Sequence, residues 1–291
     1  MHEHISGGGQ PRVPDGDIER LLDEDMCFGD LTTRALGIGA MPGRMTFTAR
    51  QALVACGAEE ASRLLSRAGA RVVFTARTGS HEGKGALLLE AEGSAAALHA
   101  GWKKAQTVME WASGVATQTH DIVAAARAVA PRIAVLCTRK SVPFTRQLSL
   151  KAVLAGGGEI HRLGLFDTLM LFPEHCTFLD RPADFGAAIA MLRQRVPERA
   201  VMVEVTSEAD ALAAAEAMAD VIQLEKFEPL AVRRVVQKIR KRPDGRPVIA
   251  AAGGINARNA GDYAKSGADT LITSAPFYAN PLDIQVLINP V

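Results

Sequence analysis

The second half of the chain alternates short apolar runs with helical stretches, and this pattern constrains the fold more than any other feature. Strands are predicted at residues 133–137, 168–172, 201–205, 221–224, 248–251 and 270–273. Helices are predicted between the later strands, at 183–195, 208–219, 229–240 and 257–266. Strands and helices that alternate with short connections indicate parallel strands joined by right-handed crossovers. The runs are apolar without clear alternation, as in strands covered on both faces.

The number of these units favours an α/β barrel. A doubly wound open sheet is the alternative, but no G-x-G-x-x-G follows a strand where a dinucleotide-binding fold needs it. Residues 17–117 read differently, as a mixed α+β domain with short strands and a long helix at 93–112. Residues 1–16 are rich in Gly and Pro and are predicted to form a flexible tail.

Composition excludes several classes of protein. Of 291 residues, 48% are hydrophobic and 22% charged, which is ordinary for a chain that buries a core. Lys+Arg 33 against Asp+Glu 32 leaves a net charge of +1, so we expect neither nucleic acid nor a membrane as partner. No apolar run is long enough for a membrane helix, and the first residues lack a signal pattern, which favours the cytoplasm. The four cysteines are widely spaced and predicted to be reduced: Cys27, Cys56, Cys137 and Cys176.

Polar and Gly-rich residues follow nearly every predicted strand of the barrel. In parallel α/β barrels the functional groups lie at the C-terminal strand ends, so we expect these residues to share one site. They are Thr138, Arg139 and Lys140 after the first strand, His161 and Arg162 further on, Glu204, Glu225 and Lys226, Ala252, Gly253 and Gly254, and Thr273 and Ser274.

The residue types in this set favour a phosphorylated, acidic substrate. Arginine forks and lysine bind phosphate and carboxylate groups, and Arg139, Lys140, Arg146, His161 and Arg162 supply cations. Glu204 and Glu225 beside them suit Mg²⁺ bound to a polyphosphate. Gly253 and Gly254, between a strand and a helix, offer backbone N–H groups to a monophosphate. No P-loop motif and no G-x-S-x-G elbow occurs, so a P-loop nucleotide triphosphatase and a serine hydrolase are not supported.

Several motifs together resemble the nicotinate-nucleotide pyrophosphorylase family, also called quinolinate phosphoribosyltransferase. They occur in order over roughly residues 18–285: EDMCFGDLTT, SGVAT, TRKSVPFTR, KAVLAGGGEIHRLGL, VEV, QLEKF and AAAGGIN. TRK followed by GGG-x-x-HR-x-GL is the most specific part. Within the family the chain is most similar to the ModD branch, which is found with molybdate transport systems.

The resemblance implies a type II phosphoribosyltransferase fold, with an N-terminal α/β-sandwich domain and an incomplete (β/α) barrel of parallel strands. The barrel is expected over 118–276, with residues 277–291 packing back on the N-terminal domain. The family forms homodimers whose sites are shared between subunits. It joins a pyridine dicarboxylate to phosphoribosyl pyrophosphate with Mg²⁺ and releases pyrophosphate and CO₂, in the pathway to NAD.

The resemblance also assigns roles to individual residues. Arg139, His161 and Arg162 fall on positions that hold the acidic substrate, and Lys140 falls on a contact to substrate and pyrophosphate. Glu204 serves the end that holds ribose and Mg²⁺, and Glu225 stands where the family usually has Asp. Residues 252–254, with Thr273 and Ser274, are expected to bind the 5′-phosphate.

Two departures from the family pattern concern the acid-binding end. Lys103 stands where the family places an arginine that reaches the partner's site, and Phe172 stands where it places a lysine that holds a quinolinate carboxylate. Losing one charge-assisted contact typically costs about 1.5–3 kcal/mol. We therefore expect a heteroaromatic acid other than quinolinate, or a looser choice of acid. Alternatively, Phe172 points into the core and Lys226 supplies the missing charge.

Three functions remain open on the sequence. The first is a phosphoribosyltransferase of altered acceptor choice, with a link to molybdenum use. The second is a non-catalytic anion-binding or regulatory protein of molybdate uptake, which the retained Glu204 and Glu225 oppose. The third is a genuine quinolinate phosphoribosyltransferase, which Phe172 opposes.

Overall fold

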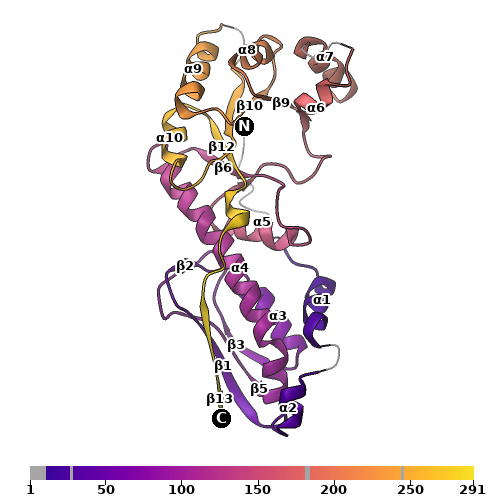
Figure 1. Cartoon of the computed structure of the whole chain (residues 1–291), viewed down its shortest axis with the longest axis vertical. Helices are drawn as coiled ribbons and strands as arrows, with labels where there is room; N and C mark the ends of the chain where they lie inside the picture. Colours follow the sequence, from indigo (N-terminus) through magenta and orange to yellow (C-terminus); the bar gives the residue numbers. More distant parts are fainter. Residues whose placement is uncertain (1–10, 27–28, 181–183, 244–245) are drawn as a thin grey trace. The chain divides into compact units, whose positions relative to one another are not determined.

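The computed structural model describes residues 11–26, 29–180, 184–243 and 246–291 (Figure 1). The chain divides into two compact units. Unit 1 comprises Met1–His120, Ser141–Gly157 and Pro276–Val291, and unit 2 comprises Asp121–Lys140 and Gly158–Ala275. Each unit is described by itself below.

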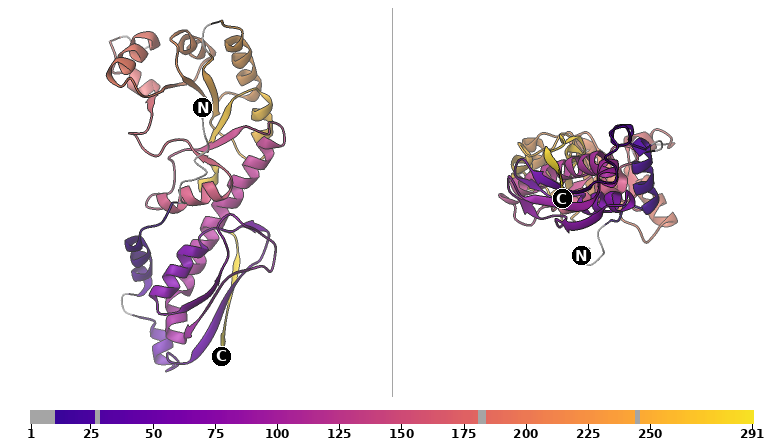
Figure 2. Two further views of the ribbon diagram at one scale, coloured as in Figure 1. Left: turned by 180° about the vertical axis from the view of Figure 1, so that it is seen from behind. Right: turned by 90° about the horizontal axis from the view of Figure 1, so that it is seen from below.

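Unit 1 is built on a four-stranded antiparallel sheet of order β13-β1-β5-β3. Its strands are β1 (Pro42–Ala49), β3 (Arg71–Thr75), β5 (Leu87–Ser94) and β13 (Ile284–Pro290). The last strand pairs with the first over its whole length, from Gly43 opposite Pro290 to Ala49 opposite Ile284. The rear view in Figure 2 shows this yellow strand beside the indigo and purple strands of the N-terminal region. The C-terminal segment thus completes the sheet of unit 1.

Helices cover one face of this sheet and form the core of unit 1. They are α3 (Ala58–Arg67) and α4 (Ala95–Arg127), whose Leu65, Leu98 and Met109 pack with Met45 and Phe47 of β1. The smaller elements are α1 (Asp15–Met26), α2 (Leu31–Ala35), β2 (Leu53–Val54), β4 (His81–Glu82) and α5 (Arg146–Ala155). Helix α4 runs through the predicted boundary at 117/118, because its apolar positions continue to Ile122 and Ala126.

The SGVAT motif has a structural use in unit 1. The Ser113 hydroxyl accepts a hydrogen bond from the Cys56 backbone nitrogen at 3.1 Å, and Thr117 accepts one from the Val54 nitrogen at 2.9 Å. A Cβ on Gly114 would lie 2.5 Å from the Asn280 carbonyl oxygen, so this glycine lets the C-terminal segment approach α4. The motif therefore holds β2 and residues near 280 against one helix.

A buried ion pair explains why residues 141–157 belong to unit 1, while the expected extent of the barrel domain, 118–276, stays a prediction. Lys151 on α5 is 4% exposed, and its Nζ lies 2.7 Å from an oxygen of Glu60, which is itself 3% exposed. The same nitrogen lies 3.0 Å from Glu59 Oε2. A buried charge requires such a partner, so α5 is fixed to α3.

Unit 2 is built on a seven-stranded sheet of order β7-β6-β12-β11-β10-β9-β8, in which every pair is parallel. The strands are β6 (Ala134–Cys137), β7 (Glu159–Ile160), β8 (Leu169–Leu171), β9 (Val201–Val205), β10 (Val221–Glu225), β11 (Val248–Ala252) and β12 (Thr270–Thr273). The edge strands β7 and β8 do not pair with each other in this order, so the barrel is incomplete. The predicted fold class is confirmed in both units.

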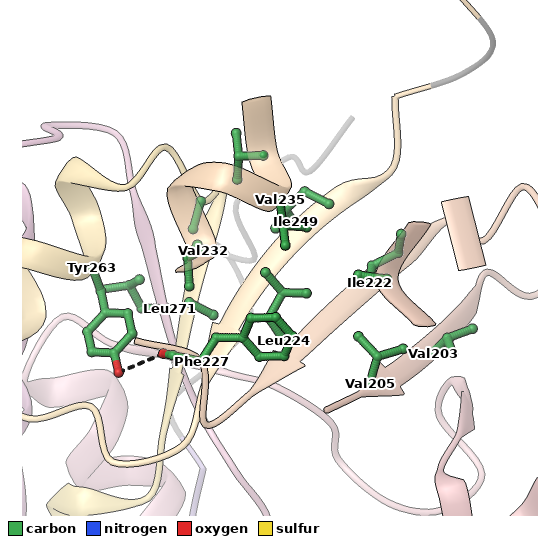
Figure 3. Packing of buried hydrophobic residues seen from close by; sticks show 14 of the residues in the cluster. Val203, Val205, Ile222, Leu224, Phe227, Val232, Val235, Ile249, Tyr263 and Leu271 are labelled. Carbon is green, nitrogen blue, oxygen red and sulfur yellow. Dashed lines mark hydrogen bonds between the residues drawn. The ribbon is translucent and has the colours of Figure 1, made fainter. Parts of the chain in front are cut away.

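Helices pack on the convex side of this sheet. They are α6 (Pro173–Cys176), α7 (Phe185–Arg195), α8 (Glu208–Glu216), α9 (Pro229–Arg240) and α10 (Ala260–Lys265), and a 3₁₀ turn follows at Ala275–Tyr278. Figure 3 shows Ile222 and Leu224 of β10 within one apolar cluster with Val232 and Val235 of α9. The Tyr263 hydroxyl donates to the Phe227 carbonyl oxygen at 3.0 Å, the dashed line in the figure. The other face carries a smaller apolar cluster of Ala250, Ala252 and Ile272, and polar residues lie among it and at the strand ends.

Several smaller expectations can be compared with the described residues. The first ten residues of the predicted tail lie outside them, but Val13 is buried and α1 begins at Asp15, so the tail is shorter than predicted because Val13 packs with Ile18 and Leu64. Cys27 also lies outside them, whereas Cys56, Cys137 and Cys176 are free and buried. In the part of the chain that the structure describes, no helix is long and apolar enough to cross a membrane.

Candidate active site

The alternation of side chains along β10 determines which residues face the hollow of the half-barrel. Ile222 and Leu224 belong to the cluster packed under the helices, so Gln223 and Glu225 point to the opposite face. Glu204 on β9 is in register with Gln223. β10 is covered on both faces, as expected, and Val221 on this face packs in a second apolar cluster with Ala250 and Ile272.

Cationic side chains follow the adjacent strands β6 and β7. Cys137 and Ile160 are paired in register, and the His161 backbone nitrogen donates to the Cys137 carbonyl oxygen at 3.0 Å. Arg139 therefore leaves the sheet beside His161 and Arg162, and its charge lowers the pKa of both. The predicted set Arg139, His161 and Arg162 thus lies at two neighbouring strand ends of unit 2.

His161 is neutral near pH 7. Burial first, and then the charges of Arg162 and Arg139, lower its pKa to about 4, while Asp167 acts in the opposite direction. Its Nε2 is buried without a hydrogen-bond partner. A neutral imidazole can donate or accept a hydrogen bond at this atom, so His161 is suited to orient an acid rather than to neutralise it.

Arg162 is a nearly buried cation, 6% exposed. Burial and the charge of Arg139 lower its pKa, and Asp167 and Glu204 oppose this shift. Its Nε is buried without a hydrogen-bond partner. Because a buried guanidinium needs an anion or acceptor, these properties suit the binding of a carboxylate or phosphate group.

Two carboxylates, Glu204 near the end of β9 and Glu225 at the end of β10, repel one another. Burial first, and then the charges of Glu225 and Glu174, raise the pKa of Glu204 to about 7, while Lys140 and Arg162 act in the opposite direction. Gln223 Nε2 donates to Glu204 Oε2 at 2.6 Å. Among the described residues no group of three or more His, Cys, Asp or Glu forms a metal cluster. Two repelling carboxylates fit Mg²⁺ that arrives with a polyphosphate, which supplies further oxygen ligands.

The loop after β11 lies so close to Lys226, which follows β10, that Gly253 has no room for a side chain. Gly253 and Gly254 have φ of +88° and +75°, and a Cβ on Gly253 would lie 2.7 Å from the Lys226 backbone nitrogen. The Lys226 nitrogen itself donates to the Ala252 carbonyl oxygen at 2.8 Å. Lys226, Gly253 and Gly254 line a cavity of about 480 Å³ together with Asn259 and Tyr263.

Side chains from two directions hold this loop. The amides of Asn256 and Asn259 donate to the Gly254 carbonyl oxygen at 3.0 and 3.1 Å. The Thr273 hydroxyl donates to the Ile255 carbonyl oxygen at 2.6 Å and accepts from the Ala275 nitrogen at 3.0 Å. Thr273 is thus engaged in shaping the loop, and a phosphate contact by Thr273 or by the half-buried Ser274 stays a prediction.

Phe172 lies outside the apolar cluster under the helices. Its ring centroid is 5.6 Å from the Arg162 guanidinium carbon and 5.6 Å from the His175 ring. The Phe172 nitrogen donates to His175 Nδ1 at 3.0 Å. This geometry places the Phe172 ring beside a predicted acid-binding cation, whereas Lys226 lies at the Gly253 loop.

Lys103 lies on α4 in unit 1, whereas the other predicted site residues except Arg146 belong to unit 2. Its Nζ is 4.2 Å from the centroid of the Trp102 ring and 3.3 Å from Gln106 Oε1. Its side chain is exposed. A role for Lys103 in a partner's site stays a prediction, as does the part of Arg146, also in unit 1.

The sequence analysis missed Gln223, Glu174 and Asp167. Gln223 is buried at 5% exposure beside Glu204, and Glu174 contributes to the raised pKa of Glu204. Asp167 accepts a hydrogen bond from the Leu163 nitrogen at 2.9 Å and faces the charges of His161 and Arg162. The two polar residues spaced by two on β10, Gln223 and Glu225, were the available signal for Gln223. Nothing comparable marks Glu174 and Asp167.

A parallel half-barrel with cations, paired carboxylates and a glycine loop at its strand ends defines a phosphoribosyltransferase-like class of protein. The model of the quinolinate phosphoribosyl transferase C-terminal domain matches residues 115–287, and that of the N-terminal domain matches residues 30–113. The chain belongs to the quinolinate phosphoribosyl transferase family, as the motifs predicted.

The similarity extends to individual relatives. "Putative pyrophosphorylase ModD" of Rhodobacter capsulatus is 49% identical over 255 residues, which is 88% of this chain and 97% of the relative. The protein of the same name from Pasteurella multocida is 40% identical over 94% of this chain and 97% of its own length. The expected similarity to the ModD branch is confirmed.

Solved structures show the same fold. The NadC structure from Streptococcus pyogenes aligns with a TM-score of 0.86 and 26% identity, over 98% of this chain and 100% of that chain. The nicotinate-nucleotide pyrophosphorylase from Francisella tularensis aligns with a TM-score of 0.86 and 22% identity, over 97% of this chain and 100% of that chain. The second match concerns the fold alone.

Proposed function

We propose that this protein transfers the phosphoribosyl group of phosphoribosyl pyrophosphate to the ring nitrogen of a heteroaromatic acid and that quinolinate is a poor acceptor. The observation that carries this proposal is the position of Glu204 and Glu225 on adjacent strands, with the glycine loop following the next strand, β11. A protein that only bound an oxyanion would gain nothing from two carboxylates there. A link to molybdenum use rests on the ModD resemblance alone.

In this reaction the lone pair of the ring nitrogen forms a bond to ribose C1, and the bond from C1 to the pyrophosphate oxygen breaks. The leaving pyrophosphate takes that electron pair. No protein nucleophile is needed, so the contribution of the chain is to position and stabilise charge. Lys140, whose charge acts on Glu204, would hold the pyrophosphate, and Arg139 and Arg162 would orient the acid.

The proposed site has two ends, one for the phosphoribosyl group with Mg²⁺ and one for the acid. Glu204 and Glu225 would hold Mg²⁺, which neutralises charge on the pyrophosphate when bound. The loop at Gly253 and Gly254 would hold the 5′-phosphate through backbone N–H groups. Phe172 beside Arg162 makes one wall of the acid end apolar, so that a second carboxylate would be desolvated there without a partner.

The test is release of pyrophosphate from phosphoribosyl pyrophosphate in the presence of Mg²⁺ and a panel of pyridine and other heteroaromatic acids. We expect release that depends on one class of acid and is abolished in Glu204→Ala. Acid-independent hydrolysis, or no release with the whole panel, would contradict a transferase. A kcat/KM for quinolinate at or above ~10⁴ M⁻¹s⁻¹, which is typical of an evolved enzyme, would identify an ordinary quinolinate phosphoribosyltransferase instead.

A further inference from the structure

Gln223 carries a buried acceptor atom with no partner. The residue is 5% exposed, and its Oε1 is buried without a hydrogen bond. Leaving a buried amide oxygen unpaired destabilises the folded state, so such an atom requires an explanation, and a bound substrate is one.

The direction of the amide follows from its neighbour. One end of the Gln223 amide lies 2.6 Å from Glu204 Oε2. Only the NH₂ group can donate to a carboxylate, so the carbonyl oxygen is the end that points away from Glu204. The residue in register on the other side is Ala250, whose methyl group offers no donor.

The residues that share this row of the sheet define its chemistry. Leu171 is in register with Val203, and Phe172 and Glu204 each follow that pair by one residue. The row therefore runs Phe172, Glu204, Gln223 and Ala250 across four neighbouring strands. It presents an apolar ring, two kinds of oxygen acceptor and a methyl group, and no cation. A substituent with a hydrogen-bond donor fits the acceptor oxygens of this row, and the cations Lys140 and Arg162, which act on Glu204, come from outside the row.

We propose that Gln223 is a specificity-determining residue whose Oε1 accepts a hydrogen bond from an N–H or O–H group of the acceptor substrate. The acceptor is then a heteroaromatic monocarboxylic acid with one donor substituent. Its carboxylate binds the cations Arg139 and Arg162, and the donor reaches Gln223. This inference rests on the proposed function and narrows its substrate class.

The experiment compares pairs of pyridine monocarboxylates that differ only in an amino or a methyl group at the same ring carbon. The two groups are similar in size, but only the amino group donates. For wild type we expect kcat/KM to be higher for the amino-substituted member of at least one pair by about tenfold or more. Gln223→Met, which has a similar length and no acceptor oxygen, should lose that preference. Gln237→Met, on the exposed face of α9, is the matched control and should keep it.

The comparison within each pair separates recognition from a structural role. If Gln223 only held Glu204 in place, Gln223→Met would slow both members of a pair equally, and that result would overturn the proposal. Equal use of amino and methyl acids by wild type would overturn it without any variant. Calorimetric binding of the same pairs separates failure of the proposed transfer from failure of the role of Gln223. A binding preference for the amino compound without pyrophosphate release would contradict the transfer but support recognition by Gln223. No binding preference in any pair would contradict the role of Gln223 alone.

Discussion

Gly253 and Lys226 are in such close contact that a Cβ on the glycine would lie 2.7 Å from the lysine's backbone nitrogen. The contact joins the ends of β10 and β11, because the Lys226 nitrogen also donates to the Ala252 carbonyl oxygen. Any residue other than glycine must move one of the two strand ends. The shape of the candidate phosphate loop therefore depends on this pair.

Gly253→Ala should weaken binding of phosphoribosyl pyrophosphate at least tenfold and lower the free energy of unfolding by more than the about 1–2 kcal/mol expected for a positive φ alone. Gly254→Ala is the matched control, because Gly254 has φ +75° and no atom within 4 Å of its Cβ position. Calorimetry and urea denaturation measure the two effects. Equal losses in both variants would show that the contact with Lys226 is unimportant.

The stability of the protein should fall in acid partly because of His161. Its pKa is about 4 in the folded state against about 6.5 when unfolded. The unfolded state therefore binds the extra proton first, and stability is lost as the pH falls from 6.5 toward 4. One pKa unit corresponds to about 1.4 kcal/mol, so the full loss is on the order of 3 kcal/mol before solvent screening.

Urea denaturation of wild type and His161→Gln at pH 7, 6 and 5 measures this contribution. The variant should lose less stability than wild type over that interval, since it lacks the titrating ring. Parallel pH dependences for the two proteins would contradict the low pKa of His161. Titration of its ring protons by NMR gives the value directly.

Phe172→Lys should increase kcat/KM for quinolinate about tenfold or more, because an ammonium beside Arg162 gives a second carboxylate a partner. Phe178→Lys is the matched control, since Phe178 is 91% exposed on the same unit. Steady-state kinetics with quinolinate decide the matter. Unchanged kinetics in Phe172→Lys would show that this ring does not determine the choice of acid.

Binding of phosphoribosyl pyrophosphate should depend on Mg²⁺ through Glu204 and Glu225. Calorimetric titration with and without Mg²⁺ should show an affinity gain in wild type that falls at least tenfold in Glu204→Ala. Glu198→Ala, an exposed carboxylate on unit 2, is the control. Equal, Mg²⁺-independent affinity in all three proteins would remove the metal from the proposal.

Lys103 is expected to act in the site of a partner subunit. Mixing inactive Lys103→Ala with inactive His161→Ala should form heterodimers with one intact site and restore part of the activity. Subunit exchange is verified by sedimentation and by a tagged subunit. No recovery after demonstrated exchange, or a monomeric protein, would contradict a shared site.

Much of unit 2 could be predicted from the sequence because its determinants are local. Apolar runs of strand length alternate with helical stretches, and short connections leave parallel strands as the main solution. The polar residues after each run, such as Arg139, His161 and Glu225, then meet at one edge of the sheet for topological reasons alone. Unit 1 was less predictable: α5 was not predicted, and for residues 277–291 only packing on the N-terminal domain was expected, not the strand β13.

By itself, the sequence determined the alternation of the main strands and helices of unit 2, the family and the residues at the strand ends, since all of these depend on short-range pattern and motif. Only the tertiary structure decided which side chains touch. The pairing of Glu204 with Gln223 depends on the register of β9 against β10, where a shift by one residue would turn Gln223 into the apolar core. The low pKa of His161 and the pairing of Lys151 with Glu60 likewise follow from burial, which many distant residues create together.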